Sequence, residues 1–115
     1  MKAKSEVIIT DECNSEIDKI CGYIRKNLFV DIACNNLLSE ILKIIDILEY
    51  SPFIYPKIIR YKSLGKNYRK ITIKNYVIVY DVDETNNKVY LDHMFYGKSN
   101  YINKIWITKK LAKFC

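Results

Sequence analysis

The stretch from residue 68 to residue 101 constrains the fold most, because it reads as three extended segments joined by two short turns. Strand-forming residues alternate with other residues through Ile71 and Ile73, and again through Val77 and Val79. This period of two is typical of strands with one buried face. An isolated three-stranded meander is only marginally stable in water. The rest of the chain is therefore expected to cover one of its faces.

Two polar segments are predicted to form the turns of this meander. Lys74-Asn75 fits a tight turn, because Asn tolerates a positive φ at low cost. Residues 83–87 fit a longer polar turn, and the alternation then resumes from Val89 to Phe95.

The N-terminal half is predicted to form a short strand followed by two helices. Residues 6–10 are rich in β-branched side chains, and Thr10 or Asp11 can cap the next helix. We expect the first helix over residues 14–28 and the second over residues 31–49. Their apolar residues recur at helical spacing: Ile17, Ile20, Cys21, Ile24 and Leu28 in the first, and Leu37, Leu38, Ile41, Ile44, Ile45 and Leu48 in the second.

Together these elements predict one α+β domain over residues 1–115, with the order β-α-α-β-β-β. Two layers are expected: a helical hairpin packs on one face of a sheet made of the N-terminal strand and the antiparallel three-stranded meander. A short C-terminal helix is expected after Gly97, around residues 102–109. The opposite sheet face is expected to be partly open, with basic residues entering it.

The sequence indicates neither a membrane span nor a metal centre. No apolar run reaches eighteen residues, and residues 1–5 lack the apolar core of a signal peptide, so we expect a cytoplasmic chain with no membrane partner. The four cysteines include no C-x-x-C pair, and the chain has one histidine, which does not fit a closed zinc site. Reduced, mostly half-buried thiols are expected, and no cofactor or metal.

Charge is divided unevenly along the chain. Residues 1–56 carry 6 Lys and Arg against 9 Asp and Glu, a net charge of −3, whereas residues 57–115 carry 13 against 4, a net charge of +9. Such a basic half can attract a polyanion or an acidic protein segment, or it can simply be a solvated face. Its densest run contains no acidic residue and comprises Lys57, Arg60, Lys62, Lys66, Arg69, Lys70 and Lys74.

Four segments resemble those of one family. Residues 7–10 with the acidic helix after them resemble its opening strand and first helix, and residues 48–56 (LEYSPFIYP) resemble its two-proline exit from the second helix. Residues 68–71 and then residues 75–83 resemble its central strands, and residues 95–98 (FYGK) resemble its ending. In this order and spacing, the chain resembles the RelE/ParE superfamily of toxins from bacterial type II toxin–antitoxin systems. The long helices and the two prolines are more similar to the ParE branch.

The resemblance implies a toxin that is held inactive by a cognate antitoxin. The ParE branch is associated with inhibition of DNA gyrase, which requires no catalytic residues. The alternative implied by the resemblance is a RelE-like endonuclease that cuts mRNA on the ribosome. Such members usually carry arginines where this chain has Val77 and Ser99, and arginine stabilises the extra charge on phosphate in the transition state. A third interpretation is a family member that binds its antitoxin but is no longer toxic.

Two sets of candidate residues follow. If the chain is a nuclease, the catalytic candidates are Arg69, Lys70, His93 and Tyr96. The candidates for binding the antitoxin or the target are Arg60, Lys62, Lys66, Arg69, Lys70, Lys98 and Tyr101.

Three aromatic positions have a structural interpretation. His93 is expected on one strand face with Leu91 and Phe95, as a hydrogen-bonded and half-buried residue, although its pKa range would also suit a general base. Tyr76 and Tyr80 are expected on one strand face, as core residues.

Overall fold

The four-stranded sheet has the strand order β1-β4-β3-β2 and carries the two helices on one side. The structure is a computed structural model, and it describes residues 4–28, 31–58 and 68–97. The element order confirms the predicted β-α-α-β-β-β fold, whereas the expected C-terminal helix lies outside the described residues. The elements are β1 (Glu6–Ile9), α1 (Asp11–Leu28), α2 (Asp31–Tyr50), β2 (Arg69–Ile73), β3 (Tyr76–Asp83) and β4 (Lys88–Tyr96).

The sheet is mixed. Strands β2, β3 and β4 form the predicted antiparallel meander, and β1 pairs in parallel with β4 so that residues 6–9 face residues 88–91. The parallel pairing follows from the topology, because the two helices return the chain across the sheet before the meander begins. Strand β4 is thus central over its first half.

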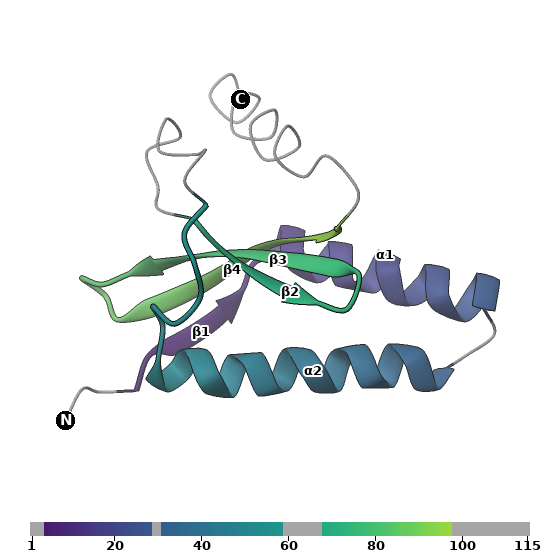
Figure 1. Ribbon diagram of the computed structural model, residues 1–115, viewed down its shortest axis with the longest axis horizontal. Helices are drawn as coiled ribbons and strands as arrows, with labels where there is room; N and C mark the ends of the chain where they lie inside the picture. Colours follow the sequence, from purple (N-terminus) through teal and green to yellow (C-terminus); the bar gives the residue numbers. More distant parts are fainter. Residues whose placement is uncertain (1–3, 29–30, 59–67, 98–115) are drawn as a thin grey trace, which may run out of the picture.

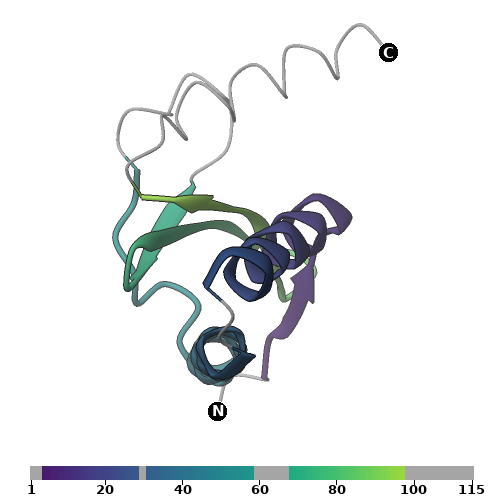
Figure 2. The ribbon, with the colours of Figure 1, turned by 90° about the vertical axis from the view of Figure 1, so that its right-hand side faces the viewer.

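Both helices lie on the same side of the curved sheet, as Figures 1 and 2 show. Their apolar stripes and the facing strand residues form one buried cluster, which explains why a meander that is marginal alone is stable here. From the helices it contains Cys13, Ile17, Cys21, Ile24, Cys34, Leu37, Ile41, Ile44 and Leu48, and from the strands Ile71, Ile73, Ile78, Tyr80, Val89, Leu91 and Met94.

Helix α1 begins three residues earlier than the sequence pattern predicted. Its N-cap is Thr10, whose hydroxyl oxygen accepts the Cys13 backbone N–H at 3.2 Å. Asp11 and Glu12 then occupy the first turn, where carboxylates interact favourably with the helix dipole. The prediction failed here because the first turn carries no apolar residue before Cys13 to mark the helical period.

The β2–β3 turn falls at the predicted residues, but its backbone differs from the expectation. Lys74, not Asn75, has the positive φ, at 51°. The Asn75 carbonyl accepts the backbone N–H of Gly97 at 2.6 Å. A Cβ atom on residue 97 would lie 3.1 Å from that carbonyl oxygen, so the close approach favours glycine. This contact fixes the end of β4 against the turn.

An irregularity in β4 overturns the predicted facing of His93. Val79 pairs with His93 while the next residue, Tyr80, pairs with Leu91, so Asp92 is the extra residue of a β-bulge. The bulge reverses the alternation. Leu91 belongs to the cluster beneath the helices, whereas Phe95 belongs to the cluster on the other face, and His93 stacks on the Phe95 ring.

The sheet face away from the helices is less open than expected. Val77, Val79 and Phe95 on this face are all buried, and they pack with Ile58 and Tyr68 in a second apolar cluster. At the outer strand, Lys70 and Thr72 are exposed. The middle of this face is therefore covered, whereas β2 leaves it partly open, as expected, with Lys70 of the basic run exposed there.

The expectation of reduced thiols is wrong for two of the cysteines. Cys21 of α1 and Cys34 of α2 form a disulfide, with their Cα atoms 5.2 Å apart. Cys13 is a buried free thiol, and burial raises its pKa to about 12, with further contributions from Glu16 and Asp92. The spacing pattern missed the bond because it depends on how α1 and α2 pack together.

We expect reduction of the Cys21–Cys34 bond to destabilise the helical hairpin. The bond closes a sequence separation of 13 residues, and a loop of about 15 residues corresponds to about 3 kcal/mol in the chain-entropy model. Urea denaturation with and without dithiothreitol measures the difference. A Cys21→Ala/Cys34→Ala control should not respond to the reductant, and an equal response in both proteins would contradict the assignment.

Candidate functional site

Four of the sequence-predicted site residues are described by the structure, and they do not converge on one point. Arg69, Lys70, His93 and Tyr96 lie on β2 and β4, the two strands that flank β3. The other predicted binding residues lie outside the described residues: Arg60, Lys62, Lys66, Lys98 and Tyr101.

Lys70 and His93 face the side of the sheet away from the helices. Lys70 pairs with Val79, which in turn pairs with His93, so the three residues form one row across the sheet. Two strand spacings separate Lys70 from His93, which is about 10 Å between their backbones. Their side chains share a face but are not neighbours.

Arg69 and Tyr96 belong to the helix-facing side and lie at different ends of it. Arg69 is at the start of β2, whereas Tyr96 pairs with Tyr76, which pairs with Ile73 at the end of β2. The length of β2 places these positions about 13 Å apart along the strand direction. The four nuclease candidates are therefore divided between two faces.

Arg69 holds the segment that follows α2. Its guanidinium donates hydrogen bonds to the carbonyl oxygens of Phe53 at 3.2 Å and Tyr55 at 2.6 Å. It also lies over the Phe53 ring, 5.1 Å from the centroid, which is a cation–π geometry. Both N–H groups of Nη1 are thus used inside the fold.

Tyr80 supports the same segment from beneath and confirms the expectation of a core tyrosine. Its side chain is fully buried, its hydroxyl donates to the Pro52 carbonyl at 2.9 Å, and its ring meets Tyr55 edge-on at 6.2 Å. Burial raises the pKa of Tyr80 to about 12. Arg69 and Tyr80 together fasten the chain as it leaves α2.

Replacement of Arg69 should destabilise the protein whatever the target is. We expect Arg69→Ala to lower the free energy of unfolding by about 1.5–3 kcal/mol, because charge-assisted hydrogen bonds of this kind are worth about that much. Arg69→Lys should recover only part of it, since lysine lacks the planar fork. Urea denaturation measures both, with the exposed neighbour Lys70→Ala as control. An unchanged free energy of unfolding in Arg69→Ala would rule out a structural role for Arg69.

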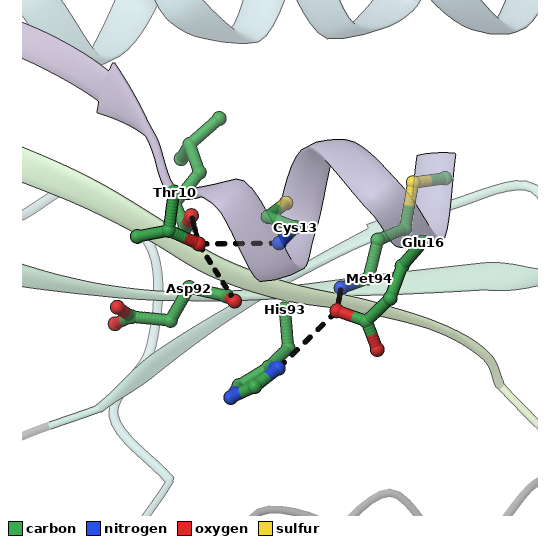
Figure 3. Close-up of polar contacts among 7 residues, drawn as sticks. Thr10, Cys13, Glu16, Asp92, His93 and Met94 are labelled. Carbon is green, nitrogen blue, oxygen red and sulfur yellow. Dashed lines mark hydrogen bonds and ion pairs between the residues drawn. The ribbon is translucent and has the colours of Figure 1, made fainter. Parts of the chain in front are cut away.

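Side chains at the start of α1 cover the edge of β4 beyond β1 (Figure 3). The Thr10 hydroxyl donates to the carbonyl oxygens of Leu91 and Asp92, at 3.0 and 3.1 Å. One turn further along, Oε1 of Glu16 accepts the Met94 backbone N–H at 3.3 Å. Buried backbone groups need such partners, and α1 supplies them where β1 has ended.

Glu16 also orients His93. Its Oε1 lies 3.2 Å from Nδ1 of His93, whose ring is stacked on Phe95 with centroids 5.4 Å apart. The ring is half-buried, as predicted for this residue. With Nδ1 directed at the carboxylate, Nε2 points to the opposite side of the ring in Figure 3. A carboxylate–histidine pair of this form can hold a general base in one tautomer.

Loss of Glu16 should leave two partners unsatisfied. We expect Glu16→Ala to lower the free energy of unfolding by about 1–3 kcal/mol, the usual cost of a buried donor without an acceptor. Glu12→Ala, one turn earlier on the same helix, should cost under about 1 kcal/mol, since only the helix-dipole interaction is lost. Guanidinium denaturation compares them. Equal losses in the two variants would refute the bridging role of Glu16.

The part of the chain that is described contains neither a metal-binding group of side chains nor a membrane-spanning helix. Residues 4–28, 31–58 and 68–97 contain no group of three or more His, Cys, Asp and Glu side chains arranged to hold a metal ion. Neither α1 nor α2 is apolar enough over eighteen residues to span a bilayer.

A tyrosine-lined cleft is the feature that sequence reasoning missed. It has a volume of about 490 Å³ and lies between α1 and the ends of β3 and β4. Tyr76 was expected in the core and Tyr96 among the nuclease candidates, and nothing in their spacing relates them to Tyr23. The lining residues are Lys19, Ile20, Tyr23, Tyr76 and Tyr96.

Comparison with known proteins identifies the family of this chain. Residues 7–100 match the family model described as the ParE toxin of the type II toxin–antitoxin system parDE. The match covers most of the chain and, except for Glu6, all the elements of the described residues. The chain therefore belongs to the ParE toxin family, within the RelE/ParE superfamily. A search of curated proteins finds no match.

Proposed function

We propose that this toxin acts by binding and inhibiting DNA gyrase, in the cytoplasm, and that a cognate antitoxin neutralises it. The family membership supplies the toxin class and implies the antitoxin. The choice of a binding mechanism rests on how the candidate residues are placed.

The observation that carries the proposal is that the four candidates within the described residues are divided between two faces of the sheet. Phosphoryl chemistry requires cations and a base within a few ångströms of one phosphate. Lys70 and His93 face one side, and Arg69 is turned to the other and donates to the Phe53 and Tyr55 carbonyls. Inhibition by surface contact does not require these groups to meet.

Val77 supports the same choice. It occupies the position where the mRNA-cleaving, RelE-like members of the superfamily usually carry an arginine. Its side chain is buried among Val79, Phe95 and Tyr68. An arginine placed there would need a charged partner or a route to solvent, so this part of the sheet is built for packing.

One observation favours the second candidate, a ribosome-dependent mRNA endonuclease. Glu16 and His93 form the carboxylate–histidine pair described above, and Lys70 lies in the same row of the sheet. A histidine base with one cation is a reduced form of a nuclease centre. This candidate predicts that activity depends on Nε2 of His93.

Two assays on the purified chain separate the candidates. We expect it to block supercoiling by DNA gyrase and to leave cleaved DNA, while message added to a translation extract stays intact. His93→Asn is the decisive variant, because the Asn amide can still donate to Glu16 but cannot act as a base. The potency with which His93→Asn inhibits gyrase should stay within about twofold of wild type, because surface substitutions usually have effects no larger than this.

The opposite pattern would overturn the proposal. Cleavage of message at codon boundaries, with a loss of 10²-fold or more in His93→Asn, would establish the nuclease instead. Lys70→Ala serves as the companion variant, since its exposed side chain lies on the same face. Absence of both activities would support the third interpretation, a chain that binds an antitoxin without being toxic.

A further inference from the structure

The tyrosine cleft defined above joins two parts of the chain far apart in sequence. Lys19, Ile20 and Tyr23 come from successive turns of α1. Tyr76 begins β3 and its pairing partner Tyr96 ends β4. Its volume of about 490 Å³ is large enough to receive one or two amino-acid side chains.

The strand side of the cleft is held in place before any ligand binds. Tyr76 and Tyr96 are cross-strand partners, with their rings edge-on at 6.0 Å. Partial burial, together with Tyr96 and Tyr23, raises the pKa of the Tyr76 hydroxyl. Gly97 directly follows Tyr96, and its backbone N–H donates a hydrogen bond to the carbonyl oxygen of Asn75, the residue before Tyr76. A site made ready in this way loses little entropy on binding.

Accessible tyrosines give the cleft the chemistry of a protein-binding site. Tyr23 is 63% exposed and Tyr96 is 45% exposed, and both present ring surface together with a hydroxyl. Tyrosine is enriched at binding hot spots because it offers a large, rigid, amphipathic contact. The Lys19 ammonium beside these rings can pair with a carboxylate. The ligand that fits is an apolar side chain next to an acidic one.

The surrounding charge disfavours a nucleic acid. Stacked bases need a groove that carries cations along the phosphate backbone, and Lys19 is the only cation among the lining residues named for this cleft.

We propose that this cleft anchors the antitoxin, by receiving an aromatic or large aliphatic side chain whose neighbouring Asp or Glu pairs with Lys19. This rests on the proposed function, in that an antitoxin binds this chain. Beyond the proposed function, this inference says where the antitoxin is anchored and which kinds of side chain its anchoring segment carries. The anchor lies on the α1 side of the fold, away from the basic residues of β2.

Calorimetric titration tests the anchor with the full-length protein encoded by the small open reading frame adjacent to the gene. We expect Tyr23→Ala, Tyr96→Ala and Lys19→Glu each to weaken binding at least tenfold, as hot-spot losses do. The matched controls are on α2: Tyr50→Ala, an exposed tyrosine, and Lys43→Glu, an exposed lysine. The dissociation constants of these two control variants should stay within about threefold of the wild-type value.

The outcomes distinguish this proposal from the one on which it rests. If the wild-type chain fails to bind the neighbouring protein, the antitoxin assignment fails. If it binds and the cleft variants bind as tightly as the controls, the assignment stands and the anchor is wrong. The anchor proposal would also be overturned if the wild-type chain bound a single-stranded oligonucleotide tightly and Tyr23→Ala abolished this binding. A change of oligomeric state in gel filtration that is confined to the cleft variants would overturn it as well. Tyr23 and Lys19 are surface positions, so their variants should fold, and circular dichroism checks this.

Discussion

The second half of β4 depends on α1 for hydrogen-bond partners that a strand would otherwise supply. Strand β1 ends at Ile9, level with Leu91, and within the described residues no strand pairs with the following edge of β4. Thr10 and Glu16 of α1 bond this edge instead. A backbone group buried without a partner is costly, so these bonds fix the position of α1. That position in turn brings Cys21 to Cys34 and Tyr23 to the end of the meander.

Local sequence pattern was sufficient for the elements of the fold but not for the details that depend on packing. The alternation of apolar residues predicted the strands of the meander, and the β-branched residues 6–10 predicted β1. The helical spacing of apolar residues predicted α1 and α2. Alternation also placed His93 with Leu91, and this failed because a bulge at Asp92 inserts one residue against β3. A bulge is set by the fit of two strands, so one strand read alone does not show it.

The candidate site was predictable only where its residues are close in sequence. The basic run was visible as a charge pattern, but which cations are free to bind depends on three-dimensional partners. Arg69 uses its guanidinium on the Phe53 and Tyr55 carbonyls. The cleft between Tyr23, Tyr76 and Tyr96 had no sequence signal, since these residues are brought together by α1 crossing the end of the hairpin.

The parallel pairing of β1 with β4 has a consequence for synthesis of the protein. Residues 6–9 are synthesised long before residues 88–91, the residues to which they hydrogen-bond. Contacts across so many residues slow folding, because a long loop must close before they form. Among the described strands, β1 therefore gains its partner on the ribosome only after residues 88–91 have been translated. A polypeptide interrupted before β4 cannot complete its sheet, so premature termination yields no folded toxin.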